Sequence, residues 1–113
     1  MTTDRQNWRQ HIANVILISV ASVQSGHPHD ASAWIDLEDR VGPKMAEEIW
    51  NDKTFAPVLH ALDYYCHAAQ HDEWDVGEGL TIDHIARILI ECAESLERGE
   101  EIFPRMTKIF AWK

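Results

Sequence analysis

Four side chains of the kinds that ligate metals recur along one short segment, HALDYYCHAAQH, residues 60–71. They are His60, Asp63, His67 and His71. At about 100° per residue on a helical wheel they fall within roughly 80° of one another, so one helix face would carry three imidazoles and a carboxylate. These groups are the usual ligands of zinc and of di-iron sites in helical proteins. The segment therefore raises the hypothesis of a metal-dependent hydrolase.

The opposite side of the same helix argues against that hypothesis. It carries a core-facing apolar surface formed by Val58, Leu59, Ala61, Leu62, Tyr65, Cys66 and Ala69. The histidines should therefore point toward solvent, whereas a carboxylate-bridged metal cage in a bundle needs ligands that project inward from at least two facing helices. The chain also contains no His-Glu-x-x-His motif. We interpret the histidine stripe as a solvated helix face and expect no cofactor.

A second group of carboxylates, Glu91, Glu94 and Glu97, lies near the end of the chain. The Glu94-Ser-Leu-Glu97 spacing is similar to that of the helices that hold Mg²⁺ in small helical nucleotide pyrophosphohydrolases, since carboxylates at i and i+3 face one way. The second carboxylate pair of that family, ending in Asp, is missing here, and Glu94 can instead pair with Arg98 on the surface. Hydrolysis of a small phosphorylated substrate, on this face or on the histidine face, remains the alternative hypothesis.

Other familiar catalytic patterns are missing from the sequence. Cys66 and Cys92 have no zinc-finger or Cys-x-x-Cys spacing, and Gly77-Glu78-Gly79 lacks the spacing and the lysine of a phosphate-binding loop. No serine stands in a Gly-x-Ser-x-Gly context. We therefore assign no catalytic residue and expect a protein other than an enzyme.

The elements that must position these residues are all helical. Apolar periodicity, capping residues and Gly or Pro breaks predict helices over residues 3–24, 32–41, 43–52, 54–71 and 82–98. Thr54 and Thr81 are the expected caps of the last two helices, and Asp30 or Ser32 that of the second. Because Leu17 and Ile18 add to its apolar positions, the first helix should be apolar almost all round and the most buried of the helices. The sequence predicts an all-α, irregular bundle of about five helices in a single domain, residues 1–113, with a basic, aromatic tail over residues 102–113.

Charge is the most informative feature of the composition. The chain has 113 residues and a net charge of −9, and residues 30–101 hold eighteen of its nineteen acids with only five Lys or Arg. Such a field repels nucleic-acid phosphates and membrane surfaces and speeds encounters with basic partners. The apolar run near the N-terminus is broken by Asn14, Ser19 and Ser22 and is too short to span a bilayer, so we expect a cytoplasmic protein.

These observations favour a small acidic protein-binding module, or inhibitor, that neutralises a basic protein or nucleoprotein complex. The partner would be a toxin, a nuclease or a nucleic-acid-binding complex, as for immunity proteins and phage-encoded inhibitors of bacterial defence. The expected partner-binding residues are the exposed acids and one tryptophan of three segments: Asp36, Glu38, Asp39, Glu47, Glu48, Asp72, Glu73, Trp74 and Asp75. A third hypothesis is a homo-oligomer joined through the histidine face or the tail residues Ile109, Phe110 and Trp112.

Overall fold

The computed structural model describes the backbone of residues 3–71 and 82–100, and the side chains of residues 7–70 and 82–100. This part of the chain folds into α1 (Thr3–Gln24), a short 3-10 turn η1 (Pro28–Asp30), α2 (Ala33–Val41), α3 (Pro43–Trp50), α4 (Ala56–His71) and α5 (Ile82–Arg98). It contains no strand. The prediction of an all-α bundle of about five helices is therefore confirmed. The expected tail, residues 102–113, lies outside the described residues.

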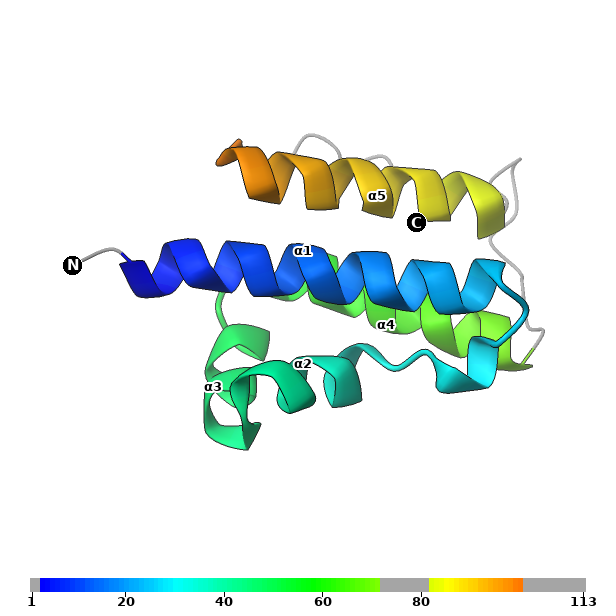
Figure 1. The fold of residues 1–113 in the computed structure, drawn as a ribbon, viewed down its shortest axis with the longest axis horizontal. Helices are drawn as coiled ribbons and strands as arrows, with labels where there is room; N and C mark the ends of the chain where they lie inside the picture. The colour runs from blue at the N-terminus through cyan, green and yellow to red at the C-terminus, as the bar shows by residue number, and fades with distance from the viewer. Residues whose placement is uncertain (1–2, 72–81, 101–113) are drawn as a thin grey trace.

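Helix α1 is the central element of the bundle. It contacts α5, α2, α4 and η1, and Figure 1 shows α5 running antiparallel along one side of it while α2 and α3 lie on the other. Helix α4 contacts α1, α2, α3 and α5 and completes the core. The short α2 and α3 are joined at Gly42, whose φ of 86° is a backbone conformation that favours glycine. These two helices form an outer layer on the side of the molecule away from α5 (Figure 1).

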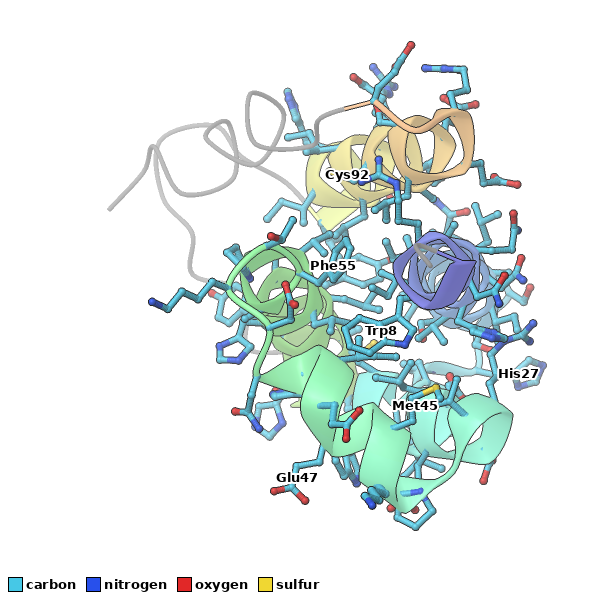
Figure 2. The ribbon with its side chains drawn as sticks, turned by 90° about the vertical axis from the view of Figure 1, so that its left-hand side faces the viewer. Trp8, His27, Met45, Glu47, Phe55 and Cys92 are labelled. Carbon is cyan, nitrogen blue, oxygen red and sulfur yellow. The ribbon has the colours of Figure 1, made fainter. Side chains whose placement is uncertain are left out.

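The core is lined by the apolar stripes that the periodicity predicts. On α5 the side chains of Ile85, Leu89, Cys92 and Leu96 are buried, and on α4 the predicted core surface is buried except for Ala69, which is half-buried. Trp8 of α1 and Phe55 meet edge to face with ring centroids 6.5 Å apart, in the interior between α1 and α4 (Figure 2). An edge-to-face aromatic pair adds roughly 1 kcal/mol to the stabilisation that burial alone provides.

Two details of the helices differ from the prediction. Helix α1 is not buried all round, because Leu17 is 37% and Ile18 is 45% exposed. Thr54 does not cap α4, which begins at Ala56. Instead Asp52 Oδ1 accepts a hydrogen bond from the Thr54 N–H at 2.8 Å, and the Asp52 carbonyl accepts from the N–H groups of Phe55 and Ala56. An aspartate that bonds the backbone two residues on makes a tight turn of its own, and it replaces the threonine cap here.

The cap predicted for α2 is present. Ser32 has an extended backbone, and its side chain accepts a hydrogen bond from the Ile35 N–H at 3.3 Å. Ser32, rather than Asp30, is therefore the N-cap of α2. Gln70, near the end of α4, donates from Nε2 to the Ala31 carbonyl at 2.6 Å. This bond joins α4 to the linker before α2.

Arg9 joins the two ends of the described chain. Its guanidinium donates to the carbonyls of Leu96 at 3.1 Å and Ser95 at 3.3 Å, and to that of Glu100. Carbonyls in the last turn of a helix have no partner within the helix, and a cation there interacts favourably with the helix dipole. Arg9 therefore caps the C-terminus of α5 from α1.

Candidate partner-binding surface

Four of the predicted acids lie on the outer layer that α2 and α3 form. Asp39, Glu47 and Glu48 are exposed and Glu38 is half-buried, and we call these four residues the acidic face. Figure 2 shows the Glu47 side chain extending from α3 away from the rest of the protein. The apolar stripes of the two helices face the core and bury Leu37 on α2 and Ala46 and Ile49 on α3. The acids of both helices therefore lie on the solvent side. Lys44 lies in a shallow hollow with Glu47, Glu48 and Asn51, and Arg40 is a second exposed base on α2.

Asp36, also predicted to bind the partner, lies in a different environment. It is half-buried beneath α1, where its Oδ2 accepts a hydrogen bond from the Oγ of buried Ser19 at 3.1 Å. Burial is the main cause of a raised pKa at Asp36, opposed by the hydrogen bonds from Ser19 and the Ser32 backbone, and nearby Asp39 raises it further. The carboxylate is thus engaged within the bundle. The last four predicted residues, Asp72, Glu73, Trp74 and Asp75, lie outside the described residues.

An open aromatic depression adjoins the acidic face. It has a volume of about 330 Å³ and is lined by Trp50, His60, Asp63, Tyr64 and His67. The rings of Trp50 and His60 lie 5.7 Å apart and 35° from parallel, so α3 and α4 together form one aromatic wall. Behind it, Trp34 of α2 meets Trp50 edge to face at 5.4 Å. We call these five lining residues the aromatic depression.

The depression and the acidic face are neighbours along both outer helices. Glu47 precedes Trp50 by three residues on α3, and Glu38 follows Trp34 by four on α2. Residues three and four apart lie on the same side of a helix. Each tryptophan of the packed pair therefore has a carboxylate one helical turn away.

The expected orientation of the histidine stripe is observed. His60, Asp63 and His67 are exposed, and Tyr64 is 39% exposed beside them; the side chain of His71 is outside the described residues. Within residues 7–70 and 82–100, no three His, Cys, Asp or Glu side chains come together in an arrangement that could hold a metal ion. Nothing in this part of the chain therefore favours the hydrolase hypothesis, which stays an untested prediction.

The carboxylates of α5 face away from the outer layer. Glu94 and Glu97 are exposed and Glu91 is half-buried. Glu97 Oε2 accepts a long hydrogen bond from Gln10 of α1 at 3.5 Å. The expected partner of Glu94 is engaged elsewhere, because Arg98 makes its ion pair with Glu100 at 3.1 Å. The hydrogen bond to Glu100 and the negative charge of Glu100 are the main causes that raise the pKa of Arg98, and the charge of Glu94 adds a smaller contribution.

Both cysteines are free thiols in the core. Burial is the main cause that raises the pKa of Cys66 to about 11. A thiol with that pKa is protonated at neutral pH and is a poor nucleophile. Cys66 therefore does not form a reactive pair with its neighbour His67, which points outward.

Comparisons with known proteins give no family for the chain. No protein-family model matches it, and neither a curated protein nor a solved structure is significantly similar to it. None of the helices in residues 3–71 and 82–100 is long and apolar enough to cross a lipid bilayer.

Sequence reasoning did not single out Trp34 and Trp50 as parts of a site. Both tryptophans are half-buried and packed against the core. The signal that could have identified them is the density of tryptophan, five in 113 residues, with two on the short acidic helices. A tryptophan on a short, highly charged helix has little core to enter and tends to stay partly at the surface.

Proposed function

We propose that this protein is a small binding module that neutralises a basic partner through the acidic face of α2 and α3. The partner is a toxin, a nuclease or a nucleic-acid-binding complex, and the mode of action is that of an immunity protein or a phage-encoded anti-defence inhibitor. The module masks the basic surface by which such a partner engages nucleic acid. It does not itself bind nucleic acid, because its own charge repels phosphates.

One observation carries this proposal: exposed carboxylates and partly exposed aromatic rings share one surface. Asp39, Glu47 and Glu48 are exposed on the outer layer, and the aromatic depression opens beside them between α3 and α4. Tight, electrostatically steered interfaces combine these features, with aromatic anchors at the centre and charges around them that accelerate association. Seven acids and three Lys or Arg lie between residues 33 and 71, so this segment is negative despite Arg40, Lys44 and Lys53.

The proposal is tested by capturing partners from the source cells with the immobilised protein and with a charge-reversed variant. We expect Glu47→Lys with Glu48→Lys to lose the captured partner, because two attractions become two repulsions at the centre of the surface. With the recovered partner, the association rate at low salt should fall by about tenfold to a hundredfold, and the loss should shrink as salt is added.

The matched control is Glu94→Lys with Glu97→Lys on α5. This variant has the same net charge as the first, and both positions are exposed on the far side of the bundle. It should still capture the partner with an affinity close to that of the wild-type protein. Equal loss in the two variants would show that overall charge alone drives capture, and an unaffected Glu47/Glu48 variant would refute the acidic face as the binding surface.

A further inference from the structure

The aromatic depression has the chemistry of a pocket for one cationic side chain. Its wall is made of Trp50 and His60, whose rings are tilted by 35° at 5.7 Å, and Tyr64 and His67 continue the aromatic lining along α4. Asp63 is the carboxylate among the five lining residues. Aromatic faces attract cations through the ring quadrupole, and a carboxylate beside them supplies the full opposite charge.

We propose that this depression binds an arginine side chain of the basic partner. The inference rests on the proposed function and specifies how the partner is anchored. A guanidinium is planar, so it can stack on the wall formed by Trp50 and His60 while its N–H groups reach Asp63. The ammonium of lysine is more strongly hydrated and has no flat face to stack. The pocket therefore selects arginine over lysine.

The neighbourhood of the depression supports a cation over a neutral or acidic occupant. Glu47 lies one turn before Trp50 on α3, and Glu38 lies one turn after Trp34, whose ring packs on Trp50 at 5.4 Å. Both carboxylates extend the negative field to the rim of the pocket. An aliphatic anchor would gain nothing from Asp63, and an acidic one would be repelled by it. Charge complementarity thus identifies the occupant.

The packing behind the pocket indicates that it exists before the partner arrives. Trp50 packs edge to face with Trp34 and also contacts the ring of His60, and Ile49 beside it is fully buried in the core. A rigid aromatic wall loses little conformational entropy when a side chain stacks on it. The pocket is therefore suited to anchor one residue of a larger, mainly electrostatic interface.

The test is a titration followed by ¹H–¹⁵N NMR, with two short unstructured peptides of equal length and charge. One peptide carries arginine and the other lysine at every basic position. We expect the arginine peptide to bind the wild-type protein at least threefold more tightly and to shift the Trp50 indole N–H resonance and the amides of residues 60–67, as roughly expected for one cation–π contact.

Two substitutions at exposed lining positions make the result specific. Asp63→Asn should lower the affinity for the arginine peptide by about threefold to tenfold. Asp83→Asn changes the net charge equally at an exposed site on α5 and should leave this affinity within about twofold of the wild-type value. Tyr64→Leu keeps an apolar side chain at a surface position and should reduce the preference for arginine. Asp63→Asn and Tyr64→Leu leave the packed Trp34 and Trp50 unchanged, so we expect both variants to fold.

Equal affinity for the two peptides, with equal losses from Asp63→Asn and Asp83→Asn, would overturn the arginine pocket. So would the failure of both peptides to shift the Trp50 indole signal. If the Glu47/Glu48 variant still loses the captured partner in that case, the proposed function stands and only the anchor is wrong. If capture is unaffected by Glu47→Lys with Glu48→Lys, the proposed function itself fails.

Discussion

At the scale of single residues, Asp36 is a carboxylate that we expected at the surface and that lies half-buried between two helices. The Oγ of Ser19 donates to its carboxylate at 3.1 Å, and burial is the main cause of its raised pKa. Ser19 and Asp36 are seventeen positions apart on different helices. Ser19 is buried on α1, and only the packing of α1 on α2 decides which carboxylate it meets.

The raised pKa of Asp36 makes a prediction about stability and pH. Because the folded protein holds this proton more tightly than the unfolded chain, stability falls as the pH rises from the ordinary carboxyl pKa through the raised one, and the cost persists at neutral pH. Asp36→Asn keeps an oxygen that accepts from Ser19 and removes the charge. We expect a higher melting temperature for Asp36→Asn than for the wild-type protein at pH 7, with the difference vanishing below the ordinary carboxyl pKa.

Thermal unfolding followed by circular dichroism at several pH values measures this difference. Glu94→Gln, at an exposed position on α5, is the control and should leave the melting temperature nearly constant at each pH. An Asp36→Asn protein that is less stable than the wild-type protein at pH 7 would contradict the account, because the charged hydrogen bond would then outweigh the cost of burial.

At the scale of helices, the sequence predicted most of what the structure shows. Helices α2, α3 and α5 each have a clear apolar stripe, and strong breaks such as Gly42-Pro43 between α2 and α3 separate neighbouring elements, so local signals were largely sufficient. The start of α4 was placed at Thr54 because threonine is a common cap, but the competing turn made by Asp52 moved it to Ala56. Leu17 and Ile18 were expected to be buried but are partly exposed. The local sequence does not indicate how many other helices pack around α1.

Arg9 caps the C-terminus of α5 from a different helix. The sequence did not predict this contact, because Ser95 and Leu96 lie 86 and 87 positions away from Arg9. Arg9→Met keeps much of the side-chain length and removes every donor to the carbonyls of Ser95, Leu96 and Glu100. We expect this substitution to lower the free energy of unfolding by about 1–2 kcal/mol. Urea denaturation measures the change.

Arg87→Met on α5 is the matched control, since it removes the same charge at an exposed position. It should change the free energy of unfolding by less than about 0.5 kcal/mol. Hydrogen exchange adds a local measurement, because loss of the cap should accelerate exchange in the last turn of α5 more than elsewhere. Equal stability of the Arg9→Met and Arg87→Met proteins would show that the cap contributes nothing.

At the scale of the whole molecule, the two sides of the bundle differ in what they offer a partner. The side of α2 and α3 combines the acidic face with the aromatic depression, whereas α5, on the other side of α1 (Figure 1), carries carboxylates on a helix whose apolar stripe is buried. Composition predicted the negative field. The juxtaposition of Trp50 with His60 and Tyr64 could not be predicted, because it depends on how α3 docks against α4.

The most direct test of the account is an NMR footprint of the recovered basic partner on the ¹⁵N-labelled protein. We expect the largest amide shifts on residues 38–50 of the outer layer and on residues 60–67 of α4, together with the Trp50 indole N–H. Amides of the middle of α5, around Arg87, should move little. A footprint centred on α5, with the resonances of Glu47, Glu48 and Trp50 unchanged, would contradict the central claim that the acidic face is the binding surface.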